Sequence, residues 1–502
     1  MASATANLLT RPASELAGLV RAGEVAAREL IEATLERVEA LNQGVNAFTA
    51  LDGERALASA ELVGAGDERP FAGVPIAIKD LFTPMKDFRQ TNCSALLAGG
   101  APATFDHNVV SRIKAAGFVI VGTTNSPEFG ILPVTEPRLN GPTRNPWDPE
   151  RTPGGSSGGA AAAVASGMVP LAQGSDGGGS LRTPASCCGL FALKPSRGRI
   201  SMAPALGESY LATPGVLTRT VADSAALLDI LGGYEPGDAS WAPEPGQSFL
   251  AACARDPGRL RVGLYTGSPL GSEIDPLCIQ AAKEAAELLC TLGHEIVETP
   301  LLDMHELMPM FTAMWAVHIA GAIALTAMLA GTAPSEEHVE PLSWALFQQG
   351  AATSALELMA ITVRLQAVSR QLVAMFADFD VLLTPSLGQR PVRIGEIDAC
   401  SQEPMADFEA SARFAPYGAI WNVTGQPAMT VPLYDGADGL PLTVQIVGRP
   451  AEEATLLSLA GQLEAACPWA QRLAPSPVSS EQQPPALRQA QPKQQTTTPP
   501  TP

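Results

Sequence analysis

A lysine near the end of an apolar segment is the first candidate for chemistry. Residues 71–81 are mostly apolar and predict a buried strand that carries Lys79. Burial disfavours the ammonium form, so the pKa of Lys79 can fall from about 10.4 toward about 7–8, where a lysine becomes a usable base. The alternative is a lysine at a strand end that extends its ammonium group to solvent or pairs with Asp80.

Two adjacent serines lie inside a glycine-rich segment, Pro-Gly-Gly-Ser-Ser-Gly-Gly at residues 153–159. Glycines on both sides of Ser156 and Ser157 allow backbone conformations that other residues avoid, and they let another group approach closely. A helix N-cap or a phosphate-binding loop are the alternatives. Neither a Gly-Lys-Ser/Thr ending nor a G-x-G-x-x-G pattern follows, which weakens the nucleotide interpretation.

A third segment places a serine directly after three glycines, Asp176-Gly177-Gly178-Gly179-Ser180. Consecutive N–H groups and the start of a following helix can stabilise an oxyanion that develops beside the serine hydroxyl. A serine needs a proton acceptor to become a nucleophile. The histidine nearest in sequence belongs to no recognisable motif, so a lysine is favoured as the base over a local Ser-His-Asp arrangement. A flexible surface turn is the alternative interpretation of this segment.

Together, the three segments resemble the amidase signature family. The resemblance covers about residues 10–470, and it is carried by residues 73–80, 143–147, 151–159, 176–184, 189–195, 425–428 and 445–450. It implies a Ser–cis-Ser–Lys triad, in which Ser180 is the nucleophile and Lys79 the base. Ser156 would be the bridging serine after a non-proline cis peptide. A proton relay from Ser180 through Ser156 to Lys79 would allow attack on a carbonyl and formation of an acyl-enzyme.

The resemblance also assigns roles around the triad, and it implies neither a metal site nor a cofactor. The oxyanion hole would be formed by the Ser180 amide together with Gly177, Gly178 and Gly179. The residues that match supporting positions of the family are Ser157, Asp176 and Arg182. Position 177 is glycine where many relatives carry a larger residue, which predicts a more mobile loop.

Substrate specificity in the family lies partly in a loop after the second strand and in variable helices, here about residues 300–380. The residues that we expect to line a substrate pocket are Phe129, Gly130, Ile131, Gly154, Gly155, Met314 and Trp315. Ordinary core packing is the alternative for each of them. Apolar and aromatic side chains among them suit an uncharged substrate better than a dicarboxylic one.

The expected fold is α/β, because residues 109–122 follow the order helix, glycine and β-rich strand. The resemblance implies one amidase-signature domain over residues 1–475, with its signature core at about 70–200. Its large twisted mixed β-sheet would be flanked on both faces by many helices. We also expect Ser14 to cap the first helix. Residues 476–502 are mostly Pro, Gln, Ser and Thr and predict a disordered tail.

Composition limits the partners of this chain of 502 residues. Its formal charge of −19 disfavours nucleic acid, which needs clustered Lys and Arg. Eight scattered cysteines predict free thiols, and the first residues lack a signal-peptide pattern, so we expect a cytoplasmic protein. Residues 307–335 carry no charge; a buried or pocket-lining helix is favoured there over a membrane span. A homodimer is one arrangement that the sequence allows.

Three functions are compatible with these observations. The leading hypothesis is an amidohydrolase for uncharged carboxamides, with aryl amides, esters, carbamates (a urethanase activity) or oligoamides as substrate classes. Residues 194–201 are shared with the oligoamide hydrolases, including the 6-aminohexanoate-cyclic-dimer hydrolase branch, and with many other family members. The second hypothesis is the glutamine-hydrolysing A subunit of a tRNA-dependent amidotransferase. The third is a non-catalytic binding protein on an amidase scaffold, which the three intact triad candidates disfavour.

Overall fold

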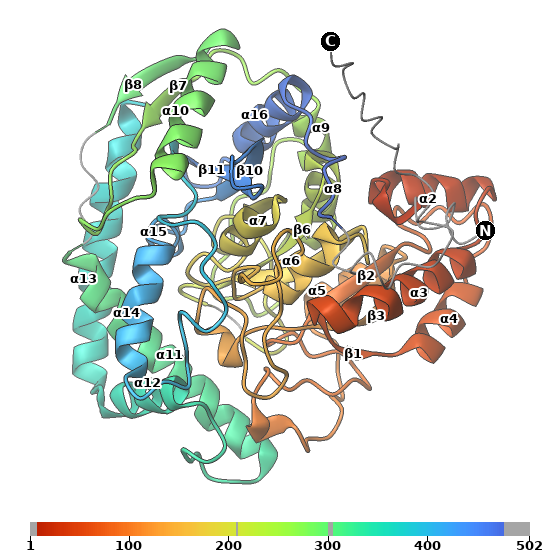
Figure 1. Cartoon of the computed structure of the whole chain (residues 1–502), viewed down its shortest axis with the longest axis horizontal. Coiled ribbons are helices and arrows are strands. Elements are labelled where there is room, and N and C mark those ends of the chain that lie inside the picture. Colours follow the sequence, from red (N-terminus) through yellow and green to blue (C-terminus); the bar gives the residue numbers. More distant parts are fainter. Residues whose placement is uncertain (1–7, 207–208, 300–304, 476–502) are drawn as a thin grey trace, which may run out of the picture.

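One mixed sheet organises the computed structural model, which describes residues 8–206, 209–299 and 305–475 (Figure 1). Within these residues, eleven strands pair in the order β1-β3-β2-β4-β6-β5-β10-β11-β9-β7-β8, and fifteen α-helices surround them. Strand β2 pairs in parallel with both β3 and β4, and β7 pairs in parallel with both β8 and β9, whereas the other pairs are antiparallel. The predicted α/β fold with a large mixed sheet is confirmed. The predicted tail, residues 476–502, lies outside the described residues.

The strands are β1 Phe48–Leu51, β2 Pro75–Lys79, β3 Val119–Thr124, β4 Leu171–Asp176, β5 Phe191–Lys194, β6 Thr213–Thr218, β7 Arg261–Leu264, β8 Glu295–Glu298, β9 Val381–Pro385, β10 Ala428–Asp435 and β11 Pro441–Gly448. The helices are α2 Ala13–Ala22, α3 Ala27–Val45, α4 Gly53–Glu61, α5 Asn108–Ala115, α6 Gly158–Ala165, α7 Arg182–Cys188, α8 Val221–Leu231, α9 Phe249–Cys253, α10 Pro276–Thr291, α11 Leu307–Ala330, α12 Pro341–Ala352, α13 Ala355–Ala374, α14 Pro404–Phe414, α15 Ala419–Thr424 and α16 Glu453–Ala466. Four short 3-10 helices are η1 Leu8–Thr10, η2 Ala95–Leu97, η3 Glu128–Gly130 and η4 Met375–Ala377.

Both faces of the sheet are covered in its central part. Every residue of β2, β3, β9 and β11 is buried. Because successive side chains of a strand point to opposite faces, full burial requires helices on both sides. Contacts of α3 with β2, α6 with β4 and α10 with β11 supply part of that cover.

Strands β2 and β4 are parallel neighbours, and both end in segments that resemble the family signature. Strands β2 and β4 run in the same direction, with Ala77 paired to Ala172, so their carboxyl ends lie at the same edge. Strand β4 begins at Leu171 and continues to Asp176. Its last residues, Gly-Ser-Asp, have low β propensity; pairing with β6 over the full length of β4 overrides that preference.

Helix positions follow the sequence pattern closely, but one cap differs. The first helix begins at Ala13 rather than after Ser14. The carboxylate of Asp223 accepts the N–H groups of Ala13 and Ser14 at 2.8 and 3.0 Å. The expectation that Ser14 caps this helix is therefore wrong, because a residue 210 positions away supplies the acceptor.

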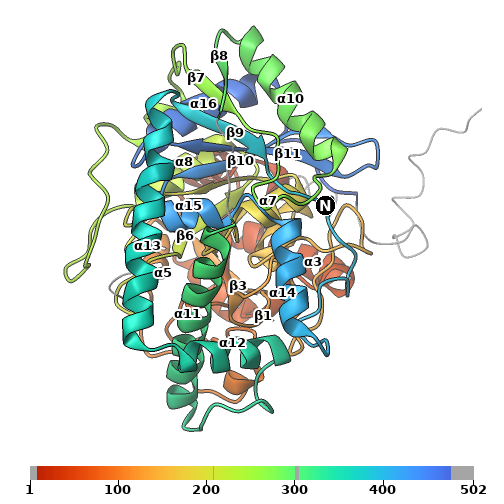
Figure 2. The same ribbon diagram turned by 90° about the vertical axis from the view of Figure 1, so that its left-hand side faces the viewer.

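Helices α11–α14 lie together on the side of the molecule opposite to α2–α4 (Figures 1 and 2). In the described part of the chain, α11 is the one helix long and apolar enough to cross a membrane. Its residues Phe311 and Met314 are buried in the fold, whereas Met328 and Leu329 near its end are exposed. Contacts with α12 and α13 incorporate α11 into this helical layer, in accord with the preferred interpretation of residues 307–335.

Candidate active site

Lys79 is the last residue of β2 and is buried, with 1% of its surface exposed. Its Nζ donates hydrogen bonds to Ser156 Oγ at 2.7 Å and to Ser175 Oγ at 3.3 Å. Burial lowers the pKa of Lys79 from 10.5 to about 7, against a smaller opposing effect of Cys93 and Asp176. At neutral pH, a large fraction of this lysine is therefore the free amine that a general base requires.

The alternative interpretation of Lys79 as a solvent-reaching or Asp80-paired side chain is wrong. Both carboxylate oxygens of Asp80 are bound by Thr91, through its N–H at 2.8 Å and through its hydroxyl. Asp80 itself is 2% exposed. No salt bridge between Lys79 and a carboxylate is found among the described residues. The amine has only hydroxyl partners, which suit its neutral form.

The glycine-rich segment brings Ser156 to Lys79. The peptide bond between Gly155 and Ser156 is cis. A Cβ atom at position 155 would lie 2.6 Å from the carbonyl oxygens of both Leu132 and Val134, so the backbone passes where a side chain has no room. The helix α6 begins two residues after Ser156.

Ser157 ties this segment to the end of β4 and to the nucleophile loop. Its hydroxyl donates to the carbonyl of Ser175 at 3.2 Å and accepts the N–H of the same residue at 3.3 Å. Its own N–H donates to the carbonyl of Ser180 at 3.2 Å. Ser157 thereby links the backbone beside Ser156 to the backbone at Ser175 and Ser180.

Asp176 anchors the loop that carries Ser180. Its buried carboxylate accepts the N–H groups of Gly179 at 2.8 Å and Leu181 at 3.1 Å. It also pairs with Arg182 at 2.9 Å, and both of these side chains are buried. Burial alone would raise the pKa of Asp176, but the charge and hydrogen bonds of Arg182 lower it below its usual range. The carboxylate is therefore ionised at neutral pH and holds the loop.

This anchoring corrects the predicted oxyanion hole in one respect. The N–H of Gly179 is already bound to the Asp176 carboxylate, so it is not a free donor. Gly177, Gly178 and Ser180 keep N–H groups with no acceptor among the described residues. These three are the donors that an oxyanion beside Ser180 could use.

Ser180 faces a cavity, and its hydroxyl is not yet part of the predicted relay. Its side chain is 8% exposed, more than that of Lys79 or Ser156. Within the described residues, the Ser180 hydroxyl makes no hydrogen bond, whereas Ser156 is bound to Lys79. Hydrogen bonds of a catalytic relay are often long before substrate binds and tighten in the complex.

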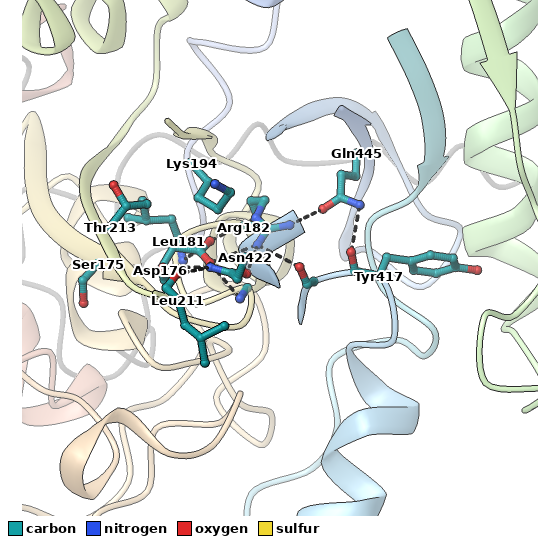
Figure 3. Close-up of polar contacts among 12 residues, drawn as sticks. Ser175, Asp176, Leu181, Arg182, Lys194, Leu211, Thr213, Tyr417, Asn422 and Gln445 are labelled. Carbon is teal, nitrogen blue, oxygen red and sulfur yellow. Dashed lines mark hydrogen bonds and ion pairs between the residues drawn. The ribbon is translucent and has the colours of Figure 1, made fainter. Parts of the chain in front are cut away.

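A polar network behind the loop was not predicted from the sequence (Figure 3). Arg182 donates to Gln445 at 2.7 Å and to Asn422 at 2.8 Å, in addition to Asp176. Asn422 lies on α15 and Gln445 on β11, more than 200 positions away in sequence. Ser175 was missed as well, although its position directly before Asp176 on the neighbour of β2 is a signal that could have identified it.

A second buried lysine lies near the same network. Lys194 is 1% exposed, and its Nζ donates to the carbonyl of Pro195 at 2.7 Å. Burial lowers the pKa of Lys194 to about 7, and the positive charge of Arg182 contributes to the same shift. Lys194 therefore titrates in the same pH range as Lys79, although it has no contact with Ser156 or Ser180 among the described residues.

The cavity in front of Ser180 encloses about 600 Å3, including its mouth. Of the predicted pocket residues, Ile131, Gly155 and Trp315 line it. The other lining residues are Leu132, Pro133, Gly178, Gly179, Ser180, Thr183, Leu270, Met308, Phe311, Phe408, Ser411, Ala412, Ala415, Pro416 and Ala419. None of these side chains is charged, so the cavity favours an uncharged ligand.

Four predicted pocket residues lie outside this lining. Phe129 is buried and stacks on Phe82, with ring centroids 6.4 Å apart. Met314 is also buried in the core, one position from the lining residue Trp315. The remaining two pack against the protein behind the cavity; they are Gly130, beside Ser156, and Gly154, against Pro184 and Cys187.

Metal binding has no support in the part of the chain that the structure describes, where no group of three His, Cys, Asp or Glu side chains could hold an ion. The described cysteines are all free, and three of them, Cys93, Cys187 and Cys188, are fully buried.

A profile of the Amidase family matches residues 29–457. The chain belongs to the amidase family. The 6-aminohexanoate-cyclic-dimer hydrolase of Paenarthrobacter ureafaciens is 36% identical over 478 residues, which are 92% of this chain and 96% of that protein. A solved structure of a 6-aminohexanoate cyclic dimer hydrolase complexed with substrate has a TM-score of 0.88 and covers 93% of this chain and 99% of its own.

The amidase is also similar to the A subunit of the glutamyl-tRNA(Gln) amidotransferase from Thioalkalivibrio sulfidiphilus. That relative is 31% identical over 484 residues, which are 92% of this chain and 98% of that protein. The resemblance inferred from the signature segments is thus confirmed, and the amidase is an amide-hydrolysing enzyme.

Proposed function

We propose that the amidase hydrolyses uncharged carboxamides through an acyl-enzyme on Ser180, with Lys79 as the general base and Ser156 as the proton relay. The observation that carries this proposal is the hydrogen bond between the buried Lys79 amine and Ser156, placed beside a serine that opens into an uncharged cavity. No charged partner holds Lys79 in its ammonium form among the described residues, so its lone pair is available.

The first half of the reaction forms an ester on the enzyme. Lys79 takes the proton of Ser156, Ser156 takes the proton of Ser180, and Ser180 Oγ bonds to the amide carbon. The N–H groups of Gly177, Gly178 and Ser180 are the proposed donors to the oxygen that becomes negative. When the carbon–nitrogen bond breaks, the leaving amine receives a proton back through Ser156, and Lys79 is again neutral.

Water completes the second half along the same relay. A water molecule gives one proton to the relay and bonds to the acyl carbon. The ester bond to Ser180 then breaks, and the serine recovers its proton as the carboxylic acid leaves. The enzyme returns to its starting protonation state without a cofactor.

The cavity supports an uncharged substrate with an apolar body. Its lining is mainly aliphatic and aromatic, and the hydroxyl-bearing residues that line it are Ser180, Thr183 and Ser411. A cyclic or linear oligoamide of methylene chains has this composition, and a 6-aminohexanoate-cyclic-dimer hydrolase is among the similar proteins. We propose oligoamides and simple aliphatic or aryl amides as the first substrates to test; esters and carbamates share the same carbonyl geometry.

The amidotransferase hypothesis has less support. Free glutamine carries an ammonium and a carboxylate, and burial of either group without a partner costs several kcal/mol. Among the described residues, no charged side chain lines the cavity to pair with them. Cytoplasmic location and a homodimer remain proposals that rest on the sequence.

The test combines three amides with matched variants. The purified full-length protein is assayed with the cyclic dimer of 6-aminohexanoate, with a p-nitroanilide of a short fatty acid, and with L-glutamine. We expect turnover of the first two amides and little of glutamine. Ser180→Ala and Lys79→Met should reduce turnover by at least about 10³-fold, whereas Ser186→Ala, which removes a hydroxyl bound to the Arg182 carbonyl on α7, should reduce it far less.

Mass spectrometry of a reaction quenched during turnover should show the acyl group on the peptide that contains Ser180. Glutamine turnover above that of the neutral amides would instead favour the amidotransferase hypothesis. Wild-type turnover by a folded Ser180→Ala variant would refute the mechanism, and binding without turnover by the wild-type protein would favour a binding protein.

A further inference from the structure

An aromatic pair from α11 lies over the nucleophile loop. Phe311 and Trp315 both line the cavity, and their rings stack with centroids 5.5 Å apart and planes 23° apart. They are four positions apart in the sequence, so they lie one turn apart on the same side of the helix. The pair therefore forms one continuous wall of the cavity.

This wall rests directly on the backbone of Gly177 and Gly178. A Cβ atom at Gly177 would lie 3.1 Å from two atoms of the Trp315 ring, Cη2 and Cζ3. A Cβ atom at Gly178 would lie 3.4 Å from Phe311 Cζ. A contact of 3.1 Å is closer than most carbon contacts in proteins, so a side chain at position 177 would require the Trp315 ring to move by a few tenths of an ångström.

We propose that Gly177 and Trp315 are a matched pair that makes the amidase selective for amides whose carbon next to the scissile carbonyl is unbranched. The inference deepens the proposed function and rests on it, because it takes Gly177, Gly178 and Ser180 as the groups that receive the carbonyl oxygen. The substrate class that follows is amides of straight-chain or flat acyl groups, including oligoamides built from methylene chains.

The argument is geometric. When the carbonyl oxygen accepts N–H groups of the loop and the carbonyl carbon bonds to Ser180, the next carbon of the acyl group lies one bond farther, beside the rings that cover the loop. A methylene group presents two hydrogens to those rings and can lie flat against them. A methyl branch on that carbon would compete with the Trp315 ring for the same space. The ring stacks on Phe311 and fills the space that a Cβ atom of residue 177 would otherwise need.

The Trp315 ring is held by packing. Its Nε1 is buried and has no hydrogen-bond partner among the described residues. The orientation of the ring therefore depends on the shape of its neighbours, and Gly177 is one of them. The effects of substitutions at Gly177 and Trp315 on kcat/KM should therefore not be additive, and a double mutant tests this.

The experiment compares p-nitroanilides of butanoic, 2-methylpropanoic and 2,2-dimethylpropanoic acid, with each kcat/KM divided by the alkaline hydrolysis rate of the same anilide. The variants are Trp315→Ala, Trp315→Leu, Gly177→Ala and Gly177→Ala/Trp315→Ala. Trp344→Ala is the control, because Trp344 stacks on Phe347 of α12 in a similar pair but does not line the cavity.

We expect the wild-type enzyme to favour the butanoyl over the 2-methylpropanoyl anilide by about 10- to 100-fold, the range seen when one methyl group is excluded from a pocket. Trp315→Ala and Trp315→Leu should reduce that ratio to about 3-fold or less. Gly177→Ala should lower kcat/KM for both anilides, and Trp315→Ala should restore part of that loss. Trp344→Ala should keep the wild-type ratio.

Three results would each overturn the inference. The first is a wild-type ratio near 1, and the second is a wild-type ratio retained by Trp315→Leu while the butanoyl anilide is still hydrolysed. The third is strict additivity of Gly177→Ala and Trp315→Ala. Failure of the proposed function looks different, because then the folded wild-type enzyme hydrolyses no anilide at all, or Ser180→Ala hydrolyses all of them.

Discussion

The pH dependence of amide hydrolysis tests the proposed base directly. With a pKa of about 7, Lys79 is half neutral at pH 7, whereas a lysine with the ordinary value of 10.5 is neutral in only about one molecule in 3,000. Burial thus raises the active fraction at neutral pH by about 10³-fold. Because the base must be deprotonated, kcat/KM should rise with pH, be about one-tenth of its maximum at pH 6, and level off above about pH 8.

A second titrating lysine complicates the assignment of that rise. The pKa of Lys194 is also lowered to about 7 by burial, so a wild-type profile alone does not identify the responsible residue. Lys194 is bound to the carbonyl of Pro195, and replacement by methionine removes its titration without touching the contact between Lys79 and Ser156. The Lys194→Met variant should therefore keep the rise in kcat/KM near pH 7.

The assay measures initial rates of a neutral anilide from pH 5.5 to 9.5 at constant ionic strength, for the wild-type enzyme and Lys194→Met. The substrate must be neutral, because a substrate that titrates in this pH range would add its own pKa to the profile. A flat profile between about pH 6 and 9 would refute the reasoning. So would loss of the rise in a folded, active Lys194→Met variant, which would transfer the titration to Lys194.

Three further predictions concern buried charges. Lys79→Met should abolish turnover. It should also raise the unfolding free energy at pH 7 by about 2–4 kcal/mol, because the cost of keeping a buried lysine neutral (about 5 kcal/mol) exceeds the hydrogen bonding that is lost (about 1–3 kcal/mol). The gain should shrink between pH 7 and 10, where the unfolded wild-type chain binds the extra proton, and a gain that grows with pH in urea unfolding would contradict it. Burial and the Glu128 charge raise the pKa of Glu340 to about 8, so the native state binds more protons than the unfolded chain between about pH 4.5 and 8 and loses stability as pH rises. Glu340→Gln should therefore stabilise the enzyme at pH 8 by at least about 1 kcal/mol more than at pH 5. Equal unfolding midpoints of the wild-type enzyme and Glu340→Gln at pH 8 would count against this. Arg182→Met removes the cation that pairs with Asp176, so the carboxylate should favour the ammonium form of Lys79 more strongly and move the midpoint of the pH–rate profile to higher pH. Arg199→Met breaks another buried pair and should leave that midpoint in place.

Short-range patterns predicted the α/β sheet and the local structure of the segments that carry Lys79, Ser156 and Ser180. The apolar strand that ends at Lys79, and the glycines beside Ser156 and Ser180, report local backbone requirements that a sequence displays directly. Longer-range partners gave no such signal. Asn422 and Gln445 hold Arg182 from helix α15 and strand β11, and a polar residue on an otherwise apolar element is equally compatible with several local roles.

The lining of the cavity was harder to predict than the contact between Lys79 and Ser156, because one wall of the cavity is a uniformly apolar helix. Along α11, most positions are apolar, so the sequence carries no contrast between a face toward the core and a face toward the cavity. Met314 and Trp315 are neighbours, yet the first is buried in the core and the second lines the cavity. The sequence does not display the packing of Phe311 and Trp315 against Gly178 and Gly177, which the structure shows at the cavity.

The two charge requirements of the site oppose each other, and Arg182 reconciles them. Asp176 must be ionised to hold the nucleophile loop through the N–H groups of Gly179 and Leu181. The same negative charge favours the ammonium form of Lys79 and would remove the base. Arg182 pairs with Asp176 at 2.9 Å in a buried site, and its positive charge opposes the field of the carboxylate. Burial outweighs the remaining effect of Asp176 at Lys79, so the pKa of the base still falls to about 7 while the charged carboxylate holds the loop.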